Sequence, residues 1–406
     1  MIDGRRPAHP GGFFAPKAEE HSYLAFGGRV GLPRLVLRFV IALALLAAVD
    51  VAVGRTLAPD SLYLHAYRLP RKLPTASLPD YVASIDASAR TRRGGPIVVF
   101  LGASPTYGHR TKDAANTYPY AFQASAEASG WPSRTFNLAS NGQFLADEYV
   151  IARRLAGDSD VVFVQLTYHT LNPKARAGAT IRYPELPKLL GVRLDAPEAK
   201  LLGVKPSAAD AAVSRADAVV GRYWLLWRER DALDRRLFGG KPQSLLARTA
   251  ASPATRLSPE AAPADDGFAS FESLDPGRQM IVISRYAENA SFEIDREGSE
   301  VRFLRALANE LAAKHKKAVF FVAPLNRELI EEYELIDPRQ YASNIAVLRG
   351  VVERNGFPLL DYNAGPDVLR SELFADISHT TDEGGLRVGA LLWRDSATYL
   401  EAVGRP

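Results

Sequence analysis

The stretch PIVVFLGASPTYG, residues 96–108, decides the fold of this chain. Residues 97–100 are apolar and mostly β-branched, which predicts a buried strand, and small residues then turn the chain out of it. Ser104 lies on this turn, at the sheet edge where open α/β folds bind ligands. It is therefore a candidate nucleophile. The alternative is that Ser104 caps the following helix, because serine before proline is a common helix start.

Strand and helix patterns alternate on both sides of this stretch. Further strands are predicted at 134–138, 160–167, 317–325 and 357–362, and helices at 118–129, 145–155, 300–314, 338–355 and from about 381. Such alternation is typical of a parallel sheet with helices on both faces. We expect a three-layer α/β/α domain around a parallel, five-stranded, flavodoxin-like sheet.

The composition is that of a globular protein. With 406 residues, of which 47% are hydrophobic, the chain is long for one domain, so we expect a main domain plus an insertion. The formal charge of +4 comes from dispersed basic residues, which excludes a nucleic-acid signature. The absence of cysteine excludes a thiol nucleophile, disulfides and cysteine-bound metal. No metal-ligand cluster, phosphate-binding loop or dinucleotide fingerprint occurs, so no cofactor is expected.

The N-terminal part has the pattern of a membrane anchor. Residues 1–31 have a composition typical of disorder, and residues 32–54 are apolar apart from Arg34, Arg38 and Asp50. This apolar stretch predicts a single transmembrane helix, with a cleaved signal peptide and a buried helix as alternatives. Residues 55–93 are expected to form a connector. We expect the anchor to lie in a bacterial inner membrane, and a slight charge bias favours an orientation with the remaining chain facing the periplasm or exterior.

Residues 173–297 interrupt the alternation and divide the domain into 94–172 and 298–406. We expect a helical insertion there, with a helix at about 208–237 and a Pro-, Ala- and Ser-rich loop at 252–267. The piece YWLLW places Trp224 and Trp227 on one face of that helix. This pattern is most typical of packing, with a membrane-interface or sugar-stacking surface as the alternative.

The residues that carry chemistry stand at the two ends of the domain. Asp376 and His379 are three residues apart on a turn before a helix, so one carboxylate can reach the imidazole from the same side. A carboxylate that fixes one ring nitrogen leaves the other free to accept a proton from a serine hydroxyl. In a doubly wound sheet, the turn after the first strand and the loop after the last strand share the carboxyl edge. We therefore expect Ser104 to meet His379.

These segments resemble the SGNH, or GDSL-type, hydrolase superfamily. The serine of the first family block, with glycine four residues on, matches 102–108; the second block matches 137–142; and the Asp-x-x-His block matches 376–379. Two positions depart from the pattern. Ala103 replaces the usual aspartate, and residues 167–172 replace the Gly-x-Asn-Asp block. The resemblance covers the ends of the soluble domain and not the insertion.

The resemblance implies a role for each matched residue. Ser104 is the implied nucleophile, His379 its general base and later acid, and Asp376 the group that orients the imidazole. The backbone N–H groups of Ser104 and Gly142 are the implied oxyanion donors.

A further oxyanion donor is expected on the loop after the third strand. The side chain of Asn172 is the preferred donor and His169 the second choice, with ordinary loop residues an equal alternative. Asn326 faces the same edge and is a further candidate for substrate contact, ranked after these two. Three other histidines are expected at the surface: His65, His109 and His315.

The resemblance and the anchor together predict a membrane-anchored serine esterase or O-acyltransferase. It would move acyl groups, with acetyl expected, on an extracytoplasmic polysaccharide through an acyl-serine intermediate, beside a membrane-bound O-acyltransferase. Ala103 and the irregular third block favour an alternative, a catalytically silent assembly or carbohydrate-binding subunit of the same fold. In a third interpretation, Ser104, Asp376 and His379 match the family pattern by chance, and the chain is a doubly wound ligand-binding domain.

Overall fold

The computed structural model describes residues 32–56, 66–69, 78–91, 95–155, 157–176, 179–192, 194–203, 224, 226, 269–366 and 368–401. The predicted segment 1–31, the loop 252–267 and nearly all of the predicted helix 208–237 lie outside the described residues. The chain forms two units, Met1–Asp50 and Val51–Pro406.

The N-terminal helix α1 spans Leu32–Thr56 and confirms the predicted apolar helix. Its stretch Val36–Val53 is long and apolar enough to cross a membrane, by length and composition. The large apolar side chains of this stretch are exposed, for example Phe39 and Leu45. Because an exposed apolar surface of this size is unfavourable in water, the helix is a candidate membrane span.

Five parallel strands form the sheet in the order β2-β1-β3-β4-β5. The strands are β1 (Ile97–Leu101), β2 (Arg134–Asn137), β3 (Val161–Leu166), β4 (Lys317–Val322) and β5 (Leu359–Asp361). This is the strand order of the flavodoxin-like fold, so the predicted fold class is confirmed. The order reverses between β1 and β3, and ligands bind beyond the carboxyl ends of the strands at such a point.

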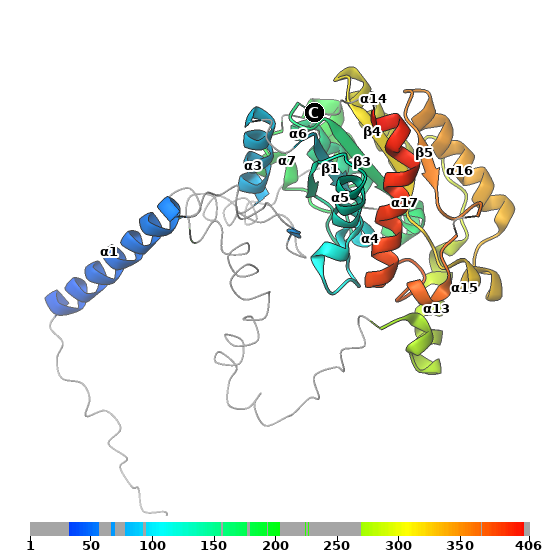
Figure 1. The fold of residues 1–406 in the computed structure, drawn as a ribbon, viewed down its shortest axis with the longest axis horizontal. Helices are drawn as coiled ribbons and strands as arrows, with labels where there is room; N and C mark the ends of the chain where they lie inside the picture. The colour runs from blue at the N-terminus through cyan, green and yellow to red at the C-terminus, as the bar shows by residue number, and fades with distance from the viewer. Residues whose placement is uncertain are drawn as a thin grey trace, which may run out of the picture. The chain divides into compact units, whose positions relative to one another are not determined.

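Helices cover both faces of the sheet (Figure 1). One face carries α5 (Tyr118–Ala128) and α17 (Asp382–Leu400). The other carries α3 (Leu78–Thr91), α6 (Leu145–Leu155), α14 (Ser299–Ala313) and α16 (Pro338–Glu353). Because neighbouring strand residues point to opposite faces, Val99 and Leu101 enter one core while Val98 and Phe100 enter the other.

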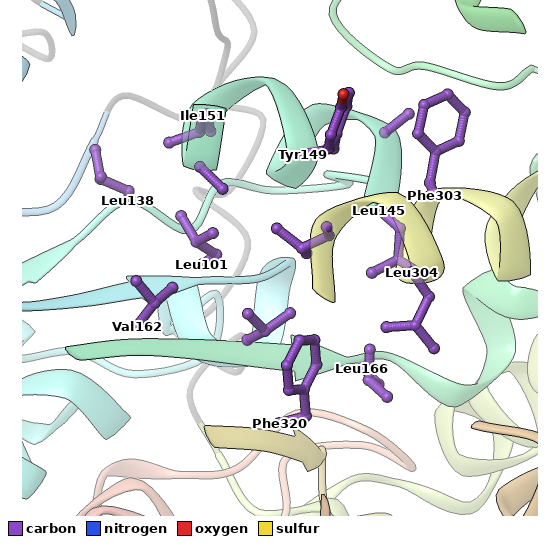
Figure 2. Close-up of a cluster of buried hydrophobic side chains, with 14 of the residues drawn as sticks. Leu101, Leu138, Leu145, Tyr149, Ile151, Val162, Leu166, Phe303, Leu304 and Phe320 are labelled. Carbon is purple, nitrogen blue, oxygen red and sulfur yellow. The ribbon is translucent and has the colours of Figure 1, made fainter. Parts of the chain in front are cut away.

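The larger core lies between the sheet and the α3, α6, α14 and α16 face. Figure 2 shows part of it, where Leu101, Val162 and Phe320 of the strands meet Leu145 and Leu304 of the helices. These five side chains are at most 4% exposed. Burial of this kind contributes roughly 25 cal/mol per Å² of apolar surface, and it holds the strand ends in place.

The expected connector 55–93 is in part a packed element. Helix α3 begins at Leu78, and its Tyr81 and Ile85 are fully buried in the larger core. Tyr81 also accepts the backbone N–H of Asn137 at 3.1 Å. The described part of this segment therefore supports β2 rather than only linking the domain to α1.

Helix α17 packs directly on the chain around α5. A Cβ atom at Gly389 would lie 2.3 Å from the Cβ of Ala121, and one at Gly385 would lie 2.1 Å from the carbonyl oxygen of Asn116. Real Cβ atoms do not approach so closely, so only glycine permits this spacing. The helix therefore lies closer to its neighbours than side-chain packing would allow.

The described part of the insertion consists of short helices, among them α7 (Leu186–Leu189), α8 (Ala196–Leu202) and α13 (Pro276–Ala290). The carboxylate of Asp147 on α6 accepts the backbone N–H groups of Arg182 at 3.0 Å and Tyr183 at 2.9 Å. Asp147 also accepts the N–H of Phe144 at 2.9 Å. This buried carboxylate ties the insertion to the first part of the domain.

Two more carboxyl groups are buried beside Asp147. Glu148 of α6 and Glu300 of α14 are at most 3% exposed, and Arg176 lies 2.9 Å from Glu300. Burial raises the pKa of Asp147 to about 6 and that of Glu300 to about 7. Burial and the neighbouring Glu300 raise the pKa of Glu148 well above its ordinary value. The folded protein therefore holds protons here that the unfolded chain releases.

Glu148→Gln tests this cluster. A raised carboxyl pKa contributes stability below the ordinary pKa of glutamate, and this stability is lost as pH rises toward the folded-state pKa. Glutamine has no such proton to lose. We expect the difference in unfolding free energy, variant minus parent, to rise by about 1–2 kcal/mol from pH 5 to pH 8. Urea unfolding at both pH values measures this gain. The exposed Glu332→Gln serves as control, and an equal difference at both pH values would contradict the expectation.

Candidate active site

Ser104 opens the short helix α4 (Ser104–Tyr107) directly after β1. Ala103 is the N-cap residue of this helix, and its side chain makes no capping hydrogen bond. The interpretation of Ser104 as the capping residue is therefore wrong. The hydroxyl oxygen of Ser104 instead lies 2.8 Å from Nε2 of His379. Ser104 is partly exposed, as an attacking group must be.

The turn 376–379 holds the other two polar residues just before α17. Thr381 caps this helix, and its hydroxyl accepts the N–H of Gly384 at 3.3 Å. The turn is closed by a hydrogen bond from the N–H of Ala375 to the carbonyl of His379 at 2.8 Å. The structure thus brings Ser104, Asp376 and His379 together at the carboxyl edge.

Asp376 fixes the imidazole of His379. Its carboxylate oxygens lie 2.7 and 2.9 Å from Nδ1 of His379. One of them also accepts the backbone N–H groups of Ser378 at 2.9 Å and His379 at 2.8 Å. Because a carboxylate only accepts, Nδ1 carries the proton and Nε2 is left to accept the hydroxyl proton of Ser104.

Asp376 remains ionised in this setting. Burial acts to raise its pKa, but His379 and the backbone N–H groups outweigh burial and hold the pKa well below the ordinary value. Arg110 adds a positive charge 3.8 Å from the same carboxylate. The three residues therefore have the geometry and charge of a proton relay that makes a serine hydroxyl nucleophilic.

Gln165 of β3 supports the serine turn from below. Its side-chain oxygen accepts the N–H of Ala103 at 3.2 Å and that of Thr106 at 3.1 Å, the residues on either side of the Ser104–Pro105 step. Gln165 is 1% exposed. A Cβ at Gly102 would lie 2.7 Å from this amide oxygen, so the turn needs glycine there. The orientation of Ser104 depends on this contact.

Gly142 lies on the loop after β2, which runs beside the serine turn. The N–H of Ser140 donates to the carbonyl of Gly102 at 3.1 Å, and Tyr183 donates to the carbonyl of Asn141 at 2.7 Å. Gly142 adopts φ +78°, a conformation that favours glycine. The loop is therefore fixed at the edge where Ser104 lies.

The loop after β3 places Asn172 and His169 differently. The Asn172 amide donates to the carbonyl of Asn289 at 3.0 Å and accepts the N–H of Lys174 at 3.0 Å, and the residue is 3% exposed. Its amide is occupied in linking this loop to α13. His169 contacts Tyr286 of α13 with a ring distance of 5.8 Å. Burial lowers the pKa of His169 to about 4, so its imidazole is neutral.

The remaining candidates have clear positions. Asn326 is fully buried, where it caps α15 (Arg327–Glu332) by accepting the N–H of Leu329 and donates to Ser371 at 2.9 Å. This is a structural role rather than a substrate contact. His109 is not remote from the site, because its ring centre lies 5.3 Å from that of His379. His315 is exposed, and His65 lies outside the described residues.

Sequence reasoning missed Gln165 and the contribution of α13. A lone amide inside the apolar run VVFVQL was a readable signal for Gln165, because a polar side chain in a buried strand needs a partner. Nothing in the sequence of α13 indicated its place beside the site. Within the described residues, no cluster of three or more His, Asp or Glu side chains could hold a metal ion.

The sequence matches no protein-family model and no curated protein. Solved structures similar to the chain include two carbohydrate acetylesterases. One is a carbohydrate acetylesterase family member from Sinorhizobium meliloti, with 10% identity over 76% of this chain and 98% of the other, and a TM-score of 0.32. The other is a second carbohydrate acetylesterase from that organism, with 9% identity over 75% of this chain and 99% of the other, and a TM-score of 0.31.

Gln165→Met tests the support of the serine turn. Methionine keeps the side-chain length but leaves two buried N–H groups without an acceptor. We expect Ser104 to react about ten-fold more slowly with a fluorophosphonate probe, and Gln165→Glu, which keeps an acceptor oxygen, to lose less. Labelling rates are measured below the unfolding transition, with Gln340→Met on α16 as control. Equal labelling rates in Gln165→Met and the parent would show that the reactivity of Ser104 does not depend on Gln165.

Proposed function

We propose that the chain is a membrane-anchored serine esterase or O-acyltransferase that moves acyl groups, acetyl foremost, on an extracytoplasmic polysaccharide. One observation carries the proposal. Asp376, His379 and Ser104 form a continuous hydrogen-bonded series, with 2.7 Å and 2.8 Å between successive polar atoms. This arrangement serves acyl transfer through a covalent serine intermediate.

In the first half of the reaction, the Ser104 oxygen attacks the acyl carbonyl and its proton passes to Nε2 of His379. The carbonyl oxygen becomes an oxyanion. Ser104 is the first residue of α4, so its N–H has no acceptor within the helix, and together with the N–H of Gly142 it can donate to that oxyanion. Each such donor is often worth ~3 kcal/mol. Asn172 is left out, because its amide already bonds Asn289.

The oxyanion then re-forms the carbonyl, the bond from the acyl carbon to the leaving oxygen breaks, and the proton on His379 passes to that oxygen, which leaves as an alcohol. In the second half, a water molecule or a sugar hydroxyl attacks the acyl-serine and gives its proton to His379. The bond from the acyl carbon to Ser104 then breaks, and the proton returns to the Ser104 oxygen. Hydrolysis and transfer share every step up to the acyl-serine. They differ only in whether water or the sugar hydroxyl reaches the ester.

The membrane part of the proposal is supported by α1. Its apolar stretch Val36–Val53 is the candidate anchor. In this proposal the helix spans the inner membrane of a bacterium once, the catalytic domain faces the periplasm or exterior, and a membrane-bound O-acyltransferase supplies the acyl group. A silent assembly or carbohydrate-binding subunit is the competing function, and it requires no reactive serine.

Ser104→Ala decides between these two functions. We expect the parent protein to release acetyl from 4-nitrophenyl acetate and to be labelled by a fluorophosphonate at Ser104, and the variant to do neither, because the attacking oxygen is gone. Residual turnover should fall by about three orders of magnitude or more. Ser125→Ala, a helix serine of α5, is the matched control. An unlabelled parent protein would favour the silent subunit.

A further inference from the structure

Arg182 lies over the loop that carries Gly142. If Gly142 had a Cβ atom, it would lie 3.6 Å from the Nε atom of Arg182. Gly142 is the proposed oxyanion donor, and its loop bonds the serine turn through Ser140 and Gly102. The guanidinium group therefore lies beside the proposed oxyanion donor.

The position of Arg182 is fixed by its backbone. Its N–H and that of Tyr183 both donate to the buried carboxylate of Asp147, at 3.0 and 2.9 Å. Tyr183 in turn donates its hydroxyl to the carbonyl of Asn141 at 2.7 Å, one residue before Gly142. The two sides of Arg182 are thus anchored to α6 and to the Gly142 loop. An exposed arginine on a mobile loop would have neither anchor.

The side chain of Arg182 is exposed. Its charge acts on the buried Asp147, whose oxygens bond backbone N–H groups, but in the described part of the chain its guanidinium forms no ion pair with a carboxylate. A guanidinium that is held in place and left without a carboxylate can bind one from a ligand, often with two parallel hydrogen bonds.

The charge around the relay is compatible with an anionic ligand. The negative charge of Asp376 is offset by Arg110 at 3.8 Å, and by His379 once it has taken the proton from Ser104. Arg182 adds a positive charge that interacts with the buried Asp147 but forms no ion pair among the described residues. An anion at Arg182 is therefore attracted rather than repelled by the site as a whole.

We propose that Arg182 binds a carboxylate of the glycan substrate, so that the enzyme acts on an acidic polysaccharide such as one containing uronic acid. This inference rests on the proposed function, which places the ester at Ser104 and its oxyanion at Gly142. It goes beyond that function by selecting acidic over neutral glycans. Arg182 is the residue that sets this selection.

The kinetic test compares two substrates that differ only in charge. They are O-acetylated oligogalacturonides and the same oligomers after methyl esterification of the carboxylates. We expect Arg182→Gln to lower the ratio of kcat/KM for the acid over the methyl ester about five- to ten-fold, and Arg182→Lys to lower it less. The ratio for the parent should also fall as sodium chloride rises from about 0.05 to 0.5 M. Arg302→Gln, an exposed arginine of α14, should leave the ratio unchanged.

Two kinetic outcomes would overturn the inference. An equal loss on both substrates in Arg182→Gln would make the side chain an oxyanion donor or a support for the Gly142 loop. An unchanged ratio would make it an ordinary surface cation.

A binding measurement separates this inference from the proposed function. In the Ser104→Ala background, calorimetry with unacetylated oligogalacturonide measures binding without turnover. We expect adding Arg182→Gln to weaken this binding about five-fold, with no such change for the methyl ester. If the parent proves catalytically silent while this dependence holds, the proposed function fails and the carboxylate site stands. If binding of the acid does not depend on Arg182, the inference fails even in an active enzyme.

Discussion

The hydrogen bond between Ser104 and His379 joins residues 275 positions apart in the sequence, and the rest of the structure serves to keep it at 2.8 Å. Ser104 is fixed by the end of β1 and by Gln165 on β3, while His379 is fixed by the closed turn before α17. Because parallel strands all point the same way, the turn with Ser104 and the turn with His379 arrive at one edge of the sheet. A single contact between remote segments thus depends on the register of the central strands and on the packing of one helix.

The polar groups around this contact form connected layers. Asp376 orients the imidazole directly, and Gln165 fixes the turn that carries Ser104. Farther out, the buried Asp147 joins α6 to the insertion and so places Arg182. Each layer consists of a buried acceptor that binds two or more backbone N–H groups. Removing one of these acceptors would break several hydrogen bonds at once. The backbone around each acceptor is therefore firmly held.

The sequence was most informative where structure follows from local patterns. Apolar runs bounded by small residues correctly predicted β1, β3 and β4. The spacing of Asp376 and His379 correctly predicted their contact, and the shared carboxyl edge of the strands correctly predicted the contact of His379 with Ser104. The sequence was less informative where a role depends on partners far along the chain. Asn172 has the right residue type for an oxyanion donor, but its amide bonds Asn289, and no local pattern reveals that contact. Helix α3 was missed for a similar reason, because its short amphipathic pattern lies in a segment rich in proline and arginine.

The glycine contacts of α17 have a consequence for how the site can change over evolution. His379 precedes this helix by three residues, and the helix touches α5 and the 114–116 turn backbone to backbone. Any side chain larger than hydrogen at Gly385 or Gly389 acts as a wedge that would tilt the helix and carry the imidazole away from Ser104. Mutational tolerance is therefore expected to be lowest along this seam, some distance from the chemistry. The loops around Ser104 that make no such backbone contact with α17 are freer to diversify.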